Sequence, residues 1–186
     1  MSGYVSVIAG RAKGKRLKVP TGQSVRPTAS RARTKLFARV EHHIRRADGR
    51  YGWPDIAVLD AFAGSGILGL EAWSRGANTV FWFDKNVEQA RSLQSQLGNY
   101  GTVYQTDALR PPRCHGQPMG LVFLDPPFAM TAYHTALTAL DKVGWLGPKT
   151  LVVTESPEFS LLQLEGWTDI NRFTVAASDF ALWKHP

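Results

Sequence analysis

The sequence contains a single cysteine, Cys114, among 186 residues. One thiol cannot form an internal disulfide, and sparse cysteine is typical of proteins from a reducing compartment. No apolar run approaches the roughly 20 residues that a membrane-spanning helix needs. The first twenty residues also lack the order of basic, apolar and small-residue regions that marks a secretory signal peptide. We therefore expect a cytoplasmic protein that makes no contact with a membrane.

Acidic residues are nearly missing from the first fifty positions. That stretch holds 13 lysines and arginines against Glu41 and Asp48, a net charge of +11, whereas residues 51–186 carry a net charge of −4. This asymmetry favours a basic RNA-binding extension over 1–50, attached to a second domain over 51–186. A merely solubilising surface or an acidic membrane partner is the less favoured interpretation. The basic residues predicted to contact RNA are Arg11, Lys13, Arg16, Arg26, Arg31 and Arg33.

The remainder of the pattern alternates short apolar runs with helical periodicity. Runs at 4–10 and 15–20 predict an N-terminal hairpin, and Pro27 and Thr28 mark the start of a helix that extends to about residue 46. Strands are expected at 56–60, 79–84, 102–107, 121–125 and 150–156, with helices at 66–76, 86–98 and 131–142. The tail, 172–185, predicts two strands around a turn at Ala177–Asp179. We expect an α/β fold with a mostly parallel, doubly wound sheet that ends in an antiparallel C-terminal hairpin.

Four of the expected strands finish on an aspartate: Asp60, Asp84, Asp107 and Asp125. Open α/β sheets bind their ligands beyond the carboxyl ends of the strands. One or two such residues are readily explained as helix caps or turn residues. Four at the same edge of one sheet indicate a binding site.

The first strand–helix junction reads VLDAFAGSGILGLEA, in which Gly64, Gly66 and Gly69 satisfy the G-x-G-x-x-G pattern of dinucleotide sites. Asp60 would repel a pyrophosphate, but it would stabilise a ligand that carries an ammonium and a sulfonium, as S-adenosylmethionine does. Asp84 then stands where the ribose needs a carboxylate, and Asp107 where the adenine needs a contact. A plain tight turn remains the alternative. The predicted cofactor-binding residues in these junctions are Asp60, Phe62, Gly64, Ser65, Gly66, Asp84, Asp107 and Ala108.

The stretch LVFLDPPF brings Asp125, Pro126, Pro127 and Phe128 to the end of a buried strand. An amine conjugated to an aromatic base is a poor nucleophile, and two acceptors on either side of it free its lone pair. The carboxylate of Asp125 and the carbonyl of Pro126 can supply them, in a turn that the prolines stiffen. Phe128 offers a ring for an extruded base, worth roughly 1–3 kcal/mol. These four are the predicted catalytic residues, acting without a metal; an ordinary turn is the alternative.

Together VIAGRAKGKRLKVP, VRPTASRARTKLF, LDAFAGSGILGLEAWSRGA and FLDPPF resemble the RsmD-type bacterial small-subunit (16S) ribosomal RNA guanine-N2 methyltransferases. The resemblance implies a Rossmann-like class I methyltransferase with an N-terminal hairpin and helix that help to grip RNA. It implies methyl transfer from S-adenosylmethionine to the N2 amine of one guanine, in an assembled or assembling 30S subunit. It also implies that Arg26, Pro27 and Thr28 sit beside the cofactor cleft, with Thr28 among the cofactor contacts. We expect a monomer.

The sequence departs from that family at two places. The family usually has a glutamate two residues before the aspartate of the second strand, where it binds the ribose; here that position is Trp82. Either Asp84 takes the ribose or Trp82 contacts the cofactor differently. Ser30 and Thr34 also replace two acids of the family, which would leave Arg31 and Arg33 less paired.

Three rival functions stay open at this stage. A DNA or RNA methyltransferase for adenine N6 or cytosine N4 would share the Asp-Pro-Pro-Phe turn, although DNA enzymes usually carry a separate recognition region. A catalytically impaired ribosomal RNA assembly factor would keep the basic extension. A nicotinamide enzyme is opposed by Asp60. Neither the adjacent pair His42–His43 on a helix nor Cys114 with His115 predicts a metal site.

Overall fold

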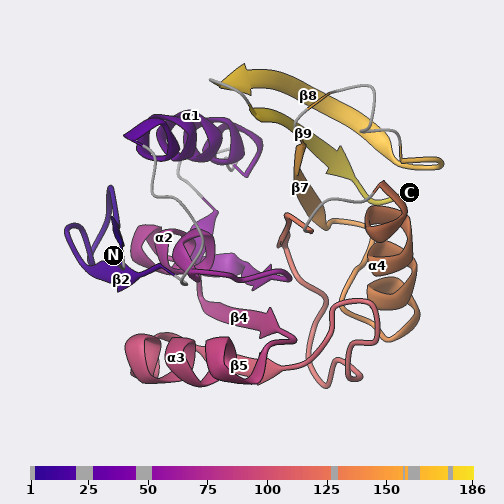
Figure 1. Ribbon diagram of the computed structural model, residues 1–186. Coiled ribbons are helices and arrows are strands. Elements are labelled where there is room, and N and C mark those ends of the chain that lie inside the picture. Colours follow the sequence, from indigo (N-terminus) through magenta and orange to yellow (C-terminus); the bar gives the residue numbers. More distant parts are fainter. Residues whose placement is uncertain are drawn as a thin grey trace.

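The computed structural model describes residues 3–19, 27–44, 52–126, 130–156, 158, 164–175 and 178–186 (Figure 1). Its strands are β1 (Tyr4–Ser6), β2 (Arg16–Lys18), β3 (Ala57–Asp60), β4 (Thr79–Asp84), β5 (Thr102–Gln105), β6 (Leu121–Leu124), β7 (Leu151–Ser156), β8 (Thr168–Val175) and β9 (Ser178–Lys184). Its helices are α1 (Pro27–His43), α2 (Ile67–Arg75), α3 (Val87–Leu97) and α4 (Met130–Lys142), with short 3-10 turns η1 (Trp53–Asp55) and η2 (Gly98–Tyr100).

Seven of these strands form one sheet in the order β5-β4-β3-β6-β7-β9-β8. The five strands from β3 to β7 are parallel, and β9 runs antiparallel to both β7 and β8. The predicted doubly wound sheet with an antiparallel C-terminal hairpin is therefore confirmed. The chain winds outward from β3 to β5 and then crosses back to β6, so the strand order reverses between β3 and β6. Ligands of such sheets bind at this switch point.

The sheet separates two apolar clusters. On one face, Leu36 and Phe37 of α1 and Leu70 of α2 pack with Leu93 of α3 and with Phe123 of β6. On the other face, α4 contributes Tyr133, Ala136, Leu137 and Leu140. Figure 1 shows α1, α2 and α3 on one side of the molecule and α4 on the other. Among the described helices, none is long and apolar enough to cross a bilayer.

The N-terminal hairpin, β1–β2, is fastened to α2 by one buried acid. Glu71, fully buried, accepts the backbone N–H groups of Ile8 (2.8 Å) and Ala9 (3.1 Å), and it also pairs with Arg75 (3.0 Å). These bonds divert the chain from the hairpin, which explains why β1 ends at Ser6 rather than near residue 10 as expected. Arg75 also binds Glu41 of α1 (2.7 Å), so the extension and the sheet domain share one packed core.

The C-terminal hairpin corrects one expectation. Ser178 and Asp179 were expected in the turn, but they begin β9, where they pair with Val175 and Thr174 of β8. Thr174 donates its hydroxyl to the Asp179 carboxylate (2.6 Å). This cross-strand bond accounts for two polar, turn-prone residues lying inside the ladder. Ala177 itself lies outside the described residues.

The indole of Trp82 fills a slot on the α2–α3 face of β4. It is fully buried, and its Nε1–H donates to the carbonyl of Gly66 (3.0 Å). A Cβ on Gly69 would lie 2.4 Å from Nε1, and one on Gly101 would lie 2.6 Å from the far edge of the ring. The slot therefore exists because two glycines face it from opposite sides.

Gly69→Ala is expected to lower the free energy of unfolding by about 1–3 kcal/mol, because the added methyl overlaps the indole. Urea unfolding followed by circular dichroism measures this effect. Gly116→Ala is the matched control, because a Cβ there meets nothing within 4 Å. Replacing Trp82 by Leu in the Gly69→Ala background should recover part of the loss; equal losses with Trp82 and with Leu would contradict the slot.

Candidate active site

Carboxylates line the edge of the sheet where the parallel strands end. Asp84 closes β4, Asp60 closes β3, Asp125 follows β6 directly, and Glu155 is the penultimate residue of β7. The register places Asp60 opposite Trp82 on one side and opposite Phe123 on the other. Asp60 and Asp125 thus flank the switch point between β3 and β6, where such a fold forms its ligand cleft.

Asp60 is buried beneath the glycine junction. Its side chain is 3% exposed, and Oδ2 accepts the backbone N–H of Gly69 (3.0 Å). Burial raises the pKa of Asp60 to about 7, the Gly69 bond opposes this shift, and the charge of Asp84 adds to it. A carboxyl group held in this state favours a ligand that brings positive charge.

The glycine junction itself needs left-handed backbone. Gly64 and Gly66 have φ values of 51° and 75°, which only glycine adopts without strain, and Gly66 directly precedes the first turn of α2. Gln89 of α3 donates to the carbonyl of Gly64. Phe62 and Ser65 are half-buried in the same junction. The loop is therefore fixed at two points, by Gln89 at the carbonyl of Gly64 and by Trp82 at that of Gly66.

Asp84 and Asp107 each accept a backbone N–H from the turn that follows their strand. Oδ1 of Asp84 accepts the N–H of Asn86 (2.9 Å), and Oδ1 of Asp107 accepts that of Leu109 (2.9 Å). Both side chains are half-buried, and partial burial raises the pKa of Asp84. Ala108, beside Asp107, is buried. Both aspartates thus bond to the backbone of their own turns, and Asp84 also bonds to the N–H of Gly64 in the glycine junction.

The position of Trp82 separates the two alternatives raised by the sequence. A fully buried indole that donates to Gly66 cannot also lie against a ligand in the cleft. Asp84, two residues further on and half-exposed, is the carboxylate that the end of β4 presents. Trp82 instead holds the glycine junction through its hydrogen bond to the carbonyl of Gly66.

Asp125 and Pro126 directly follow β6 and differ in their exposure to solvent. The side chain of Asp125 is exposed and that of Pro126 is buried. Protein groups nevertheless crowd the Asp125 carboxylate, so its pKa is raised, first by lost hydration and then by the charges of Glu155 and Asp60. The pKa of Tyr133 is raised in the same way, by burial, Asp125 and Glu155.

Glu155 was missed by the search for strand-ending aspartates. It is a glutamate, and it stands one residue before the end of β7. A search for any carboxylate near the ends of the parallel strands would have found it in the run TLVVTES. Burial raises its pKa, while a hydrogen bond with the Ser178 side chain opposes that shift.

Several predicted residues lie outside the part of the chain that the structure describes. These are Pro127, Phe128 and Arg26, and the side chain of Thr28 is likewise not described. Thr28 lies in the first turn of α1. Glu41, near the other end of that helix, binds Arg75 in the last turn of α2. Since α2 begins at the carboxyl edge of the sheet, α1 points its first turn back toward that edge and thus toward Asp60 and Asp125.

The predicted RNA-binding residues fall into two groups. The first group is exposed on the N-terminal hairpin and consists of Arg11, Lys13 and Arg16. The guanidinium of Arg11 lies 3.6 Å from the ring centre of Trp73. The guanidinium of Arg16 lies 4.4 Å from the ring centre of Tyr4. Arg31 is exposed on α1. Arg33 is only 7% exposed and donates to the carbonyl of Ser6 (2.9 Å). Arg33 therefore fastens α1 to β1 and is not a surface contact.

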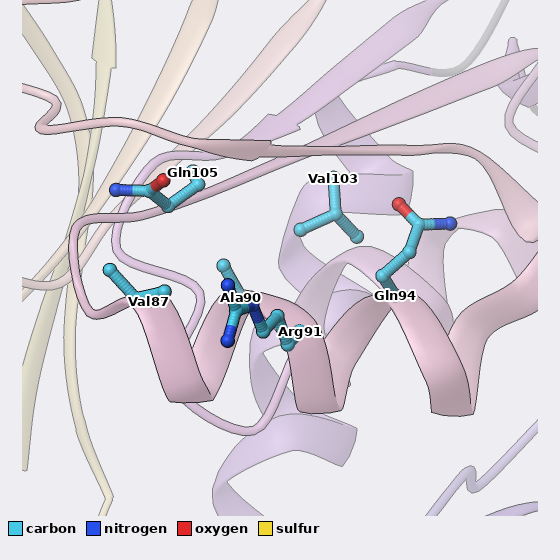
Figure 2. A pocket seen from close by; sticks show the side chains of 6 residues that line it. All are labelled: Val87, Ala90, Arg91, Gln94, Val103 and Gln105. Atoms are coloured by element: carbon cyan, nitrogen blue, oxygen red, sulfur yellow. The ribbon is translucent and has the colours of Figure 1, made fainter.

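A separate shallow groove of about 200 Å³ runs between α3 and β5 (Figure 2). It is lined by Val87, Ala90, Arg91, Gln94, Val103 and Gln105. It contains no carboxylate and none of the predicted site residues. We therefore place the active site by its chemistry, at the carboxylate edge. Among the described residues, no three histidine, cysteine, aspartate or glutamate side chains are grouped as metal ligands would be.

The comparisons with known proteins agree with this geometry. Residues 5–184 match the family model "Conserved hypothetical protein 95". Ribosomal RNA small subunit methyltransferase D of Escherichia coli K12 is 34% identical over 159 residues, which cover 83% of this chain and 76% of the relative. The chain belongs to the RsmD family. The Haemophilus influenzae member of the same name is 30% identical over 98% of this chain and 95% of its own.

Solved structures place this RsmD-family chain among class I methyltransferases. A putative methyltransferase of Escherichia coli superposes with a TM-score of 0.77 at 28% identity, covering 98% of both chains. A putative methylase of Haemophilus influenzae gives a TM-score of 0.72 at 28% identity, covering 98% of this chain and 99% of the other. The fold predicted from the sequence, a Rossmann-like class I S-adenosylmethionine-dependent methyltransferase, is confirmed.

Arg31→Ala and Arg33→Ala remove the same charge from the same helix but should act differently. Arg33→Ala is expected to cost about 1.5–3 kcal/mol of unfolding free energy, because the carbonyl of Ser6 loses a charged donor. Arg31→Ala should leave stability unchanged and weaken binding to ribosomal RNA with a shallower salt dependence. Urea unfolding and filter binding at several salt concentrations measure the two effects. Equal stability of the two variants would show that the buried Arg33 contact is not formed.

Proposed function

We propose that this protein methylates the exocyclic N2 amine of one guanine in small-subunit ribosomal RNA, with S-adenosylmethionine as the methyl donor. The acceptor is the RNA within an assembling or complete 30S subunit, in the cytoplasm. The observation that carries the proposal is the pairing of Asp60 and Asp125 at the switch point of a methyltransferase sheet. It is supported by family membership, since relatives at 30–34% identity bear the name ribosomal RNA small subunit methyltransferase D.

The residues present fit this cofactor. The left-handed glycine junction over Gly64 and Gly66 would receive its amino-acid end, with the buried carboxyl of Asp60 beside it. Asp84 would take the ribose hydroxyls, and the segment Asp107–Ala108 would face the adenine. When bound, the cofactor supplies a methyl group on a cationic sulfonium. We place Thr28 at the same cleft because α1 points its first turn there.

Asp125 and Pro126 would prepare the target amine. The Asp125 carboxylate accepts one N–H and the Pro126 carbonyl the other, so the nitrogen lone pair is withdrawn from conjugation with the ring. Because β6 is buried and paired on both sides, these two acceptors are held in place rather than drawn together on binding. The raised pKa of Asp125 suits its carboxylate to take the proton that the methylated amine releases. Pro127 would stiffen the turn and Phe128 would stack on the base, as the sequence predicts.

The basic residues would hold the RNA on two sides of the cleft. Arg31 would contribute from the first half of α1, and Arg26 keeps the RNA-binding role that the sequence predicts. Arg11, Lys13 and Arg16 lie on the hairpin that packs against the last turns of α2. Arg33 is no longer included in this surface.

The decisive experiment is transfer of labelled methyl from S-adenosylmethionine to small ribosomal subunits that lack base methylation. Asp125→Asn should lower the rate at least about 100-fold, because it removes a charged acceptor from the reacting amine. Asp141→Asn is the matched control, since that carboxylate is exposed on the far end of α4. Nuclease digestion and mass spectrometry then locate the label.

The acceptors tested in parallel discriminate the rival functions. Label on adenine N6 or cytosine N4, or on duplex DNA, would show that the Asp-Pro-Pro-Phe turn holds the amine of a different base. Absence of label from every acceptor, together with salt-sensitive binding to ribosomal RNA, would indicate an assembly factor whose cleft has lost its activity. Label at a guanine N2 that survives Asp125→Asn would refute the role given to this carboxylate.

Binding of S-adenosylmethionine should depend on pH through Asp60. The cationic ligand prefers the ionised carboxylate, so affinity should fall as the pH drops below about 7, approaching tenfold per pH unit. Titration calorimetry between pH 5.5 and 7.5 measures this slope. Asp60→Asn should bind more weakly with a flat pH dependence. A slope that persists in Asp60→Asn would assign the titration to another group.

A further inference from the structure

Glu155 is the immediate neighbour of Asp125 across the sheet. Strands β6 and β7 pair in parallel with Leu124 opposite Thr154, so the next residue along each strand is Asp125 on one and Glu155 on the other. The charge of Glu155 acts on the Asp125 carboxyl, which shows that the two groups are close. Successive side chains of a strand point to opposite faces of the sheet. Asp125 and Glu155, two residues after Phe123 and Val153, therefore lie on the same face as Phe123, which α1 covers.

The Glu155 carboxylate is held in place yet remains partly open. Tyr133 donates its hydroxyl to the Glu155 backbone carbonyl, and Ser178 hydrogen-bonds with the side chain. The residue is half-buried, and Asp125 beside it is exposed. One bond to Ser178 leaves a carboxylate with unused acceptor capacity. Ionising two adjacent carboxyl groups is costly because their charges repel, and a ligand that presents two adjacent donors offsets this cost.

Guanine presents such a pair of donors. Its N1–H lies next to its N2 amine, whereas adenine and cytosine each place a ring nitrogen lone pair next to the exocyclic amine. We propose that Glu155 determines base specificity by accepting the N1–H of the guanine whose N2 amine is held by Asp125. On an adenine or a cytosine, the same carboxylate would face a lone pair. This inference rests on the guanine-N2 function proposed above and names the residue that selects the base.

The test uses small subunits reconstituted with 2-aminopurine in place of the methylated guanine, after that nucleotide has been mapped. 2-Aminopurine keeps the N2 amine but has a lone pair at N1. The wild-type protein should methylate guanine at least about tenfold faster than 2-aminopurine, the range of one well-formed base contact. In Glu155→Gln the amide can donate to N1, and the preference should fall at least about tenfold. Ser178→Ala, which keeps the carboxylate, should retain it.

The possible results distinguish failure of the proposed function from failure of the role given to Glu155. Absence of wild-type label at a guanine N2 would refute the proposed function itself. Wild-type label with equal rates on guanine and 2-aminopurine would overturn the role of Glu155 and leave the function standing. An unchanged preference in Glu155→Gln, or equal loss on both acceptors with an unchanged melting temperature, would also overturn it. If Glu155→Gln fails to fold, the rates on guanine and 2-aminopurine are compared in the wild-type protein, Glu155→Asp and Ser178→Ala. These rates then decide whether Glu155 sets the preference for guanine.

Discussion

The buried indole of Trp82 is the contact on which the carboxylate edge depends. Its hydrogen bond to Gly66 and its fit against Gly69 set the height of the glycine junction above β4. Gly69 in turn donates to Asp60, so one side chain controls both the loop and the buried acid beneath it. A tryptophan at this position replaces a group that would touch the ligand with one that supports the loop. In the proposed site, the ligand-facing role would then pass to Asp84.

The electrostatics of the edge follow from the sheet topology. Parallel strands bring their carboxyl ends to one side, and four of the strands place an acid there, which raises the pKa values of Asp60, Asp84, Asp125 and Glu155 through burial. Several like charges in one cleft are costly in the free protein. A ligand that brings a cation or N–H donors would offset this repulsion. The cleft would therefore bind such ligands in preference to neutral or anionic ones.

Much of this arrangement could be predicted from the sequence. Alternating apolar runs and the glycine junction predict the sheet, and the Asp-Pro-Pro-Phe turn locates the reacting edge. Arg33 could not be placed correctly, because an arginine among other arginines looks exposed until its contact with Ser6, far along the chain, is known. Glu155 escaped a search restricted to terminal aspartates, and the burial of Trp82 depends on Gly101, which no local pattern connects to it. Long-range packing decides the positions of Arg33 and Trp82, whereas Glu155 is visible in the local pattern once glutamates near strand ends are considered.

The fastening of the hairpin through Glu71 has a consequence for how this protein can be divided. Glu71 is fully buried, and its oxygens are occupied by the peptide groups of Ile8 and Ala9 and by Arg75. Without the first nine residues, the sheet domain would keep an anion in its interior with half of its partners missing. The basic extension is thus not a detachable module that could be exchanged between enzymes, as its composition would suggest. A change in the hairpin or in α2 at this contact therefore alters the stability of both parts of the molecule.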